Sequence, residues 1–173
     1  MNNYFKISLL LLLSSACVVV QSQTEAVPAR MQGMLERHNY WRSQLGIADL
    51  TWSDELAAFA QEWANKLAKT CNMKHRQKSP YGENIYWKSA ASNPTEVVDA
   101  WASEQQYFNH KTQQCKGEWS VCGHYTQLIW ENTKRVGCAV AVCKDGGEIW
   151  VCNYDPPGNY IGQKPYTPKA NRP

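Results

Sequence analysis

The spacing of apolar residues predicts three amphipathic helices. In the stretch 29–45 apolar side chains recur every three or four residues, and Gly46 ends the pattern. A second helix is expected from Asp54 to about Thr70, with Ser53 as its cap. A third helix is expected to begin after Asn93 and to reach about Asn109. Asn93 can act as its N-cap, Pro94 suits the first helical position, and the carboxylate of Glu96 can hydrogen-bond back to the cap. Each helix has one apolar stripe and therefore needs a surface to cover.

The same reading predicts a few short strands and an extended tail. Residues 83–87 are typical of a strand, and two β-rich runs at 135–143 and 148–154 are expected to form a hairpin. A short helical segment is expected at 124–130, and residues 156–173, with five Pro and two Gly, favour an extended covering segment. The predicted fold class is α+β: a three-layer α-β-α sandwich with a small, mainly antiparallel central sheet.

The first 22 residues have the pattern of a secretory signal peptide. A single charge, Lys6, precedes a 14-residue apolar run, which is shorter than the ~20 residues that span a bilayer. Cleavage near Ser22 leaves one domain, residues 23–173. We expect a secreted, extracellular protein, or a periplasmic one if the source is a Gram-negative bacterium, with no membrane span. Lipidation of Cys17 is the alternative that the sequence leaves open.

The cysteine count predicts disulfides. After cleavage an even number remains, and an even number in an exported chain indicates three bridges: Cys71, Cys115, Cys122, Cys138, Cys143 and Cys152. A structural zinc cluster is the alternative, but the chain has no Cys-x-x-Cys pair. The spacing alone leaves 15 pairings open.

Charge and aromatic content narrow the function classes. The 18 basic and 15 acidic residues give a net charge of +3 and are spread along the chain, so no nucleic-acid partner is expected. The chain has eight Trp, and four of them are expected in the core rather than at a binding surface: Trp52, Trp63, Trp101 and Trp130.

Glu104 is the most informative residue, because it falls among the apolar positions of the third predicted helix. A carboxylate there has to find hydrogen-bond donors, be protonated or meet a cation. The other candidates for a shared site are His75, Glu83 and His124. Two imidazoles and two carboxylates suit a divalent transition metal.

Two other interpretations of these four residues stay open: a buried Glu–His cluster that only fixes loops, and unrelated solvated side chains. The remaining histidines are expected to be structural. His38 lies on the apolar face of the first helix, and His110 follows the third helix as a helix-end cation.

Several segments together resemble one family. They are WSDELAAFAQEWA, YGENIYW, GHYTQLIW followed by VGCAVAVC, and CNYDPPGNYIGQKPY. In this order, with six cysteines around them, they resemble the CAP superfamily (cysteine-rich secretory, antigen 5 and pathogenesis-related-1 proteins), most closely its plant-type branch. The resemblance spans about Met34 to Tyr166, nearly all of the predicted mature chain.

The resemblance implies more than the residues do by themselves. It implies an α-β-α sandwich with a central cleft floored by His75, Glu83, Glu104 and His124, in which the two imidazoles bind zinc or a similar cation with low affinity. It also implies the pairs Cys71–Cys143, Cys115–Cys122 and Cys138–Cys152.

For function, the resemblance implies a secreted binding module, for a sterol or other lipid, with a role in defence or host interaction. We expect a monomer with an unknown protein partner. One alternative is an endopeptidase, in which Glu83 or Glu104 acts as base on a metal-held water or Ser79 attacks with help from His75. The other is an interaction scaffold with a vestigial cleft. The sequence has neither H-E-x-x-H nor G-x-S-x-G, which favours binding over catalysis.

Overall fold

A mixed four-stranded sheet forms the middle layer of the molecule. The computed structural model describes residues 27–168, so the predicted signal peptide and Cys17 lie outside the described residues. The strands are β1 (Thr51–Trp52), β2 (Gly82–Lys88), β5 (Arg135–Val142) and β6 (Glu148–Asp155), in the order β1-β5-β6-β2. Only the β1–β5 pair is parallel; the long pairs β5–β6 and β2–β6 are antiparallel.

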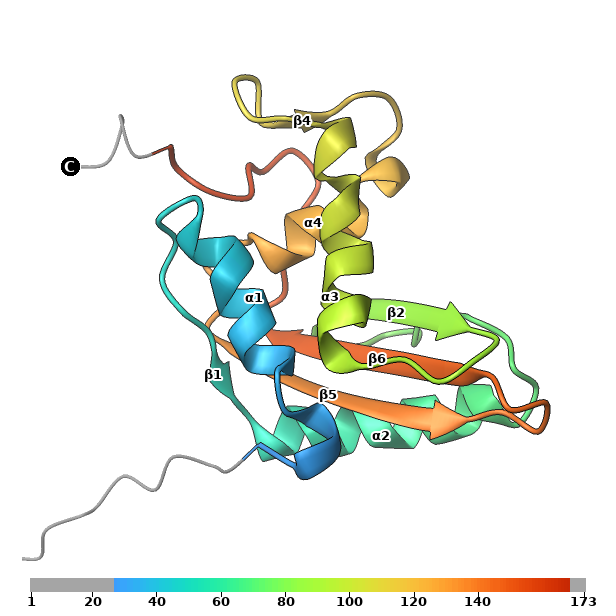
Figure 1. Cartoon of the computed structure of the whole chain (residues 1–173). Helices are drawn as coiled ribbons and strands as arrows, with labels where there is room; N and C mark the ends of the chain where they lie inside the picture. The colour runs from blue at the N-terminus through green and yellow to red at the C-terminus, as the bar shows by residue number, and fades with distance from the viewer. Residues whose placement is uncertain (1–26, 169–173) are drawn as a thin grey trace, which may run out of the picture.

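Helices cover both faces of this sheet (Figure 1). The helix α2 (Asp54–Ala68) packs along β5 and β6 on one face, while α1 (Met34–Ser43), α3 (Pro94–Ala102) and α4 (Gly123–Leu128) lie on the other. Ser53 and Asn93 cap α2 and α3 as expected, because their side chains accept from the backbone nitrogens of Leu56 and Glu96. The predicted α+β, three-layer architecture is confirmed.

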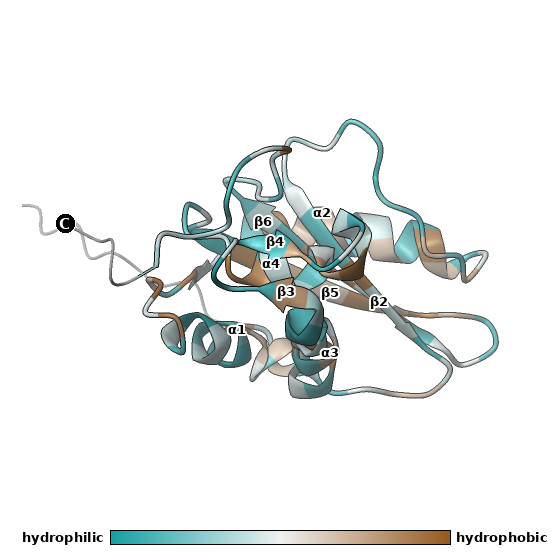
Figure 2. Cartoon of the chain, turned by 90° about the horizontal axis from the view of Figure 1, so that it is seen from above, coloured by the Kyte–Doolittle hydropathy of each residue, from teal (hydrophilic) through white to brown (hydrophobic). Residues whose placement is uncertain are grey.

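The core consists of two clusters, one on each side of the sheet. The four tryptophans expected in the core are buried, with exposed fractions of 7% for Trp52, 9% for Trp63, 2% for Trp101 and 3% for Trp130. In Figure 2 the hydrophobic segments gather at the centre of the molecule, and the outlying loops are mostly hydrophilic. No helix within residues 27–168 is long and apolar enough to cross a membrane.

Two predicted helix boundaries are wrong. The first predicted helix is interrupted at Gly33, whose φ of 86° no helical residue adopts, so a 3-10 helix, η1 (Ala29–Met31), precedes α1. The third ends at Ala102 instead of Asn109. It continues as the 3-10 helix η2 (Ser103–Tyr107) and then as β3 (Phe108–Asn109), because the backbone of Phe108 pairs with that of Cys115 in β4 (Gln114–Cys115).

Three disulfides have the pairing that the resemblance implied. Cys71–Cys143 connects the loop after α2 to the end of β5, and Cys138–Cys152 connects β5 to β6. Cys115–Cys122 closes a short loop around η3 (Trp119–Val121). The tail covers the body as predicted: Glu131 donates its backbone N–H to the carbonyl of Pro165, and Tyr166 is buried.

Candidate functional site

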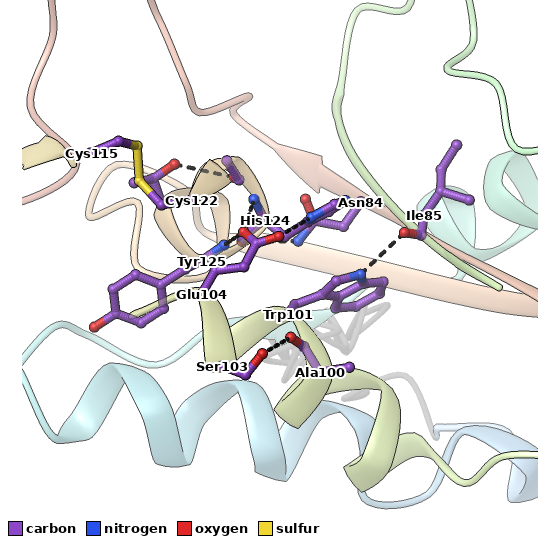
Figure 3. Close-up of polar contacts among 12 residues, drawn as sticks. Asn84, Ile85, Ala100, Trp101, Ser103, Glu104, Cys115, Cys122, His124 and Tyr125 are labelled. Atoms are coloured by element: carbon purple, nitrogen blue, oxygen red, sulfur yellow. Dashed lines mark hydrogen bonds and ion pairs between the residues drawn. A yellow bond between two sulfur atoms is a disulfide. The ribbon is translucent and has the colours of Figure 1, made fainter. Parts of the chain in front are cut away.

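Glu104 and His124 form the first of two His–Glu pairs (Figure 3). The Glu104 carboxylate accepts from His124 Nδ1 at 2.7 Å and from the backbone nitrogens of His124 and Tyr125 at 2.9 and 3.2 Å. Its side chain is 20% exposed. Glu104 lies in η2 and not in α3 as expected, and the donors that its carboxylate meets come from the first turn of α4.

His75 and Glu83 form the second pair. His75 Nδ1 donates to Glu83 Oε1 at 2.7 Å, and the same oxygen accepts from the backbone N–H of Arg76 at 3.1 Å. This hydrogen bond raises the pKa of His75 above its usual value. The other oxygen, Glu83 Oε2, is buried and has no hydrogen-bond partner among the described residues. An orphaned buried carboxylate oxygen is costly, which points to a ligand or water in this position.

The two pairs lie on neighbouring segments. Asn84, next to Glu83 in β2, donates from Nδ2 to the backbone carbonyl of His124 at 3.1 Å and to the hydroxyl of Tyr154 at 3.3 Å. The hydrogen bond to His124 ties β2, which contains Glu83, to α4, which contains His124.

The structure does not gather all four side chains at one point. In the described part of the chain, no three of them offer ligand atoms within 4.8 Å of one another. Among the described residues the four side chains form two His–Glu pairs, which are linked through the hydrogen bond between Asn84 and the backbone of His124.

The pairing leaves one nitrogen free on each imidazole. A carboxylate only accepts, so Nδ1 carries the proton in both pairs and Nε2 keeps its lone pair. Neither Nε2 makes a hydrogen bond among the described residues. This is the arrangement in which a carboxylate fixes the ring while the far nitrogen is available to a metal. The His75 side chain is 62% exposed and that of His124 33% exposed, so both are open to solvent.

Residues that the sequence did not single out hold the first pair in place. The Trp101 ring stacks against that of His124, with centroids 6.3 Å apart, while its Nε1 donates to the carbonyl of Ile85 (Figure 3). Behind Asn84, the Tyr154 hydroxyl donates to His38 Nε2 at 2.9 Å. The available signal was Asn84, a polar residue next to Ile85 in β2, and these two are the buried residues of that strand.

Ser79 and the two other histidines have structural contacts. Ser79 Oγ donates to the carbonyl of Tyr81 and accepts from its backbone N–H, as a turn residue does. His38 is fully buried on α1, as its apolar face predicted. The expectation for His110 is wrong, because α3 ends well before it; His110 instead contacts the Tyr166 hydroxyl through Nδ1 at 2.9 Å.

Comparison with known proteins identifies the chain. Residues 35–154 match the model of the cysteine-rich secretory protein family (CAP). The chain belongs to this family. The resemblance seen in the sequence motifs is thereby confirmed, over most of the range in which they occur.

Plant pathogenesis-related proteins are similar to it over most of their length. The chain is 43% identical over 170 residues to pathogenesis-related protein 1C of Nicotiana tabacum, covering 96% of this chain and 95% of that protein. It is 44% identical over 135 residues to pathogenesis-related protein 1 of Arabidopsis thaliana, covering 78% and 81%. These relatives and the three disulfides are consistent with secretion and a defence-related role.

Solved CAP structures share its fold. The crystal structure of NaASP2 with Zn2+ superposes with a TM-score of 0.65 at 25% identity, covering 83% of this chain and 90% of that one. BmVAL-1 superposes with a TM-score of 0.69 at 24% identity, covering 84% and 85%. The second likeness concerns the fold alone.

Proposed function

We propose that this CAP protein is an extracellular, defence-related binding protein whose two His–Glu pairs hold a divalent cation with low affinity. The observation that carries the proposal is the common geometry of the pairs. In both, a carboxylate accepts from Nδ1, and Nε2 has no hydrogen-bond partner among the described residues, on an imidazole that is at least partly exposed. If the two His–Glu contacts were purely structural, nothing would require both imidazoles to keep the same nitrogen, Nε2, without a partner. Nor would it require the two pairs to lie on segments that Asn84 connects.

The residues fit a zinc-like cation. His75 and His124 would be the ligands, and Glu83 and Glu104 would orient the rings and raise the basicity of the nitrogens. The buried Glu83 Oε2 lacks a partner among the described residues and would accept a hydrogen bond from a water at such a centre. Two protein nitrogens make a weak site, since structural zinc has four protein ligands. The similar protein NaASP2 was crystallised with Zn2+.

A bound cation would supply a positive centre at which an anionic or polar ligand group is held. The chain's own residues would fix the imidazoles through Glu83 and Glu104. Binding is expected to fade as the pH falls, because protonated imidazole has no lone pair to donate. The hydrogen bond to Glu83 raises the pKa of His75, so this loss should begin at a higher pH than it would for a free imidazole.

The second part of the proposal is a sterol or other lipid as the carried ligand. Its support is family membership and apolar surface. Trp119 is 72% exposed and Ile161 fully exposed, whereas most other tryptophans are buried in the core. We expect uptake of a lipid to be independent of the core tryptophans.

The catalytic alternative has less support. The Ser79 hydroxyl is engaged by the backbone of Tyr81, and His75 Nδ1 by Glu83. A nucleophile needs its base within hydrogen-bond reach, and the described contacts of Ser79 do not include an imidazole. An endopeptidase and a scaffold with a vestigial cleft both stay predictions from the sequence.

Calorimetric titration of the metal-free secreted protein with zinc at neutral pH, with and without a sterol, tests the proposal. We expect saturable binding with one equivalent of zinc, and separately saturable sterol uptake. Absence of saturable zinc binding would overturn the cation site, and absence of sterol uptake would remove the lipid ligand while leaving the cation site standing.

A further inference from the structure

One stretch of the chain is far more basic than the rest. Residues 63–82 contain five Lys or Arg and no Asp or Glu, whereas the whole chain has a net charge of only +3. The stretch begins in the C-terminal half of α2 and continues through the loop that leads to β2 (Figure 1). Although charges are spread along the whole chain, residues 63–82 therefore form a local basic cluster.

Folding arranges these charges around a surface hollow. A hollow of about 700 Å3 is lined by residues of α2 and of the following loop, four of them basic: Lys66, Lys69, Lys74 and Arg76. A second hollow of about 490 Å3 shares Lys69 with the first and adds Lys144 from the β5–β6 hairpin. We refer to Lys66, Lys69, Lys74, Arg76 and Lys144 as the cationic surface.

Contacts with the helix hold the centre of this surface in place. The Arg76 guanidinium lies 3.8 Å from the centroid of the Phe59 ring and donates to the Phe59 carbonyl. Trp63 Nε1 donates to the carbonyl of Lys74, which fixes the loop against α2. Arg76 Nε is buried and has no hydrogen-bond partner among the described residues. A fixed cation loses less conformational entropy on binding a ligand than a free one does.

The lysines of the surface are not neutralised by the protein. Within residues 27–168, Lys66, Lys69, Lys74 and Lys144 form no ion pair with a carboxylate. The lining contains one acidic residue, Glu62, which pairs with Arg76. The surface therefore has an excess of positive charge available to a partner.

Stabilisation of α2 does not account for this charge. Lys66 and Lys69 lie at the C-terminal end of the helix, where cations interact favourably with its dipole. Lys74, Arg76 and Lys144 lie outside α2, so the helix dipole gives no reason for their presence.

We propose that the cationic surface binds an acidic polysaccharide, with its carboxylate or sulfate groups on the lysines. The cations extend over two adjoining hollows, which suits a chain of regularly spaced anionic groups better than a single compact anion. Among the lining residues the one aromatic ring is that of Trp63, which is 9% exposed and already contacts Lys66 and Arg76, so no ring is free to stack on a nucleic-acid base.

The test compares two variants with the same change in net charge. The surface variant is Lys66→Gln/Lys69→Gln/Lys74→Gln. The control variant removes three exposed lysines elsewhere, Lys111→Gln/Lys134→Gln/Lys164→Gln. Affinity of the secreted protein is measured by calorimetry with heparin oligosaccharides as the sulfated probe, oligogalacturonate as the carboxylated probe and DNA of similar charge as the competing class.

The wild type is expected to bind at least one oligosaccharide, more weakly as salt increases. The surface variant should bind it roughly ten-fold more weakly or worse, and the control variant within about two-fold of wild type. The two probes distinguish sulfate from carboxylate recognition.

Equal weakening in both triple variants would overturn the proposal, as would no binding by wild type or equally tight binding of DNA. Because Lys66 and Lys69 also stabilise α2, Lys144→Glu provides a second variant outside the helix. It should weaken binding while leaving the thermal unfolding midpoint unchanged, and unchanged affinity in Lys144→Glu would remove the second hollow from the site.

Discussion

The Glu104 carboxylate holds His124 at two points, accepting from the ring Nδ1 at 2.7 Å and from the backbone N–H at 2.9 Å. It also accepts from the backbone N–H of Tyr125. A residue that lies twenty positions earlier in the chain thus satisfies amides at the start of α4 and sets the orientation of the imidazole at the same time.

Replacing Glu104 with Gln is expected to lower the free energy of unfolding by about 1–3 kcal/mol. The amide has one accepting oxygen in place of two, so at least one of the three donors loses its partner. Urea denaturation of Glu104→Gln against the exposed Glu118→Gln measures this difference. Equal stability of the two variants would show that Glu104 does not fix α4.

The buried His38 predicts a pH dependence of stability. Its Nδ1 donates to the Met34 carbonyl and its Nε2 accepts from Tyr154, and burial, with a smaller contribution from the charge of Arg42, lowers its pKa from 6.5 to about 4. The unfolded chain therefore binds more protons than the folded one between these values. The stability is fully present above about pH 6.5 and falls by roughly 3 kcal/mol as the pH drops towards 4.

Urea denaturation at several pH values, with wild type and His38→Gln side by side, measures this contribution. Carboxylates add their own pH dependence in both proteins, so the difference between the two is the relevant quantity. The variant should be less stable at neutral pH and lose less stability on acidification. Parallel pH profiles would contradict the assignment of a neutral, buried His38.

Gly137 in β5 lies where α2 begins. A Cβ at this position would be 2.2 Å from the backbone nitrogen of Ala57 and 2.4 Å from the carbonyl oxygen of Ser53. Since backbone atoms have to move, Gly137→Ala is expected to cost about 2 kcal/mol or more. Gly146→Ala serves as control, with open space around the Cβ but a φ of 86°, and should cost about 1 kcal/mol. The thermal unfolding midpoints of the two variants compare these losses of stability. A larger loss in Gly146→Ala than in Gly137→Ala would contradict this packing of α2 on the sheet.

The disulfides are expected to differ in their contribution to stability. Cys71–Cys143 has a sequence separation of 72 and Cys115–Cys122 one of 7. By loop-closure entropy, removing the first should cost about 4 kcal/mol and removing the second about 2.5 kcal/mol. Denaturation of the two double Cys→Ser variants measures the difference. A larger loss for the short loop would show that native contacts, not loop length, decide.

The sequence predicted those parts of the fold and site that depend on local pattern. The caps Ser53 and Asn93 are where the local pattern placed them. Glu104 has the hydrogen-bond donors that the sequence called for, although it lies in η2 and not on the apolar stripe of the third helix. The end of the third helix was not predictable, because it is decided by the pairing of Phe108 with Cys115 across a turn. The disulfide pairing came from the resemblance to a family, since spacing alone left it open.

Buried polar residues whose partners are distant in the chain were the hardest to foresee. Arg42 is fully buried and donates to backbone carbonyls of Ala48, Leu128, Trp130 and Thr133, while burial lowers its pKa to about 10. Asn84 likewise depends on His124 and Tyr154. Nothing in the local pattern distinguishes such residues from exposed ones, because the groups that satisfy them come together only when the sheet and helices pack.

The most direct test of the two His–Glu pairs as one cation site is a zinc titration of metal-free wild type, His75→Ala, His124→Ala and the matched control His110→Ala. The zinc affinity should fall roughly ten-fold or more in His75→Ala and in His124→Ala, and it should be unchanged in His110→Ala. The double variant His75→Ala/His124→Ala should show no saturable binding. Zinc affinity in the double variant equal to that of wild type would contradict the account.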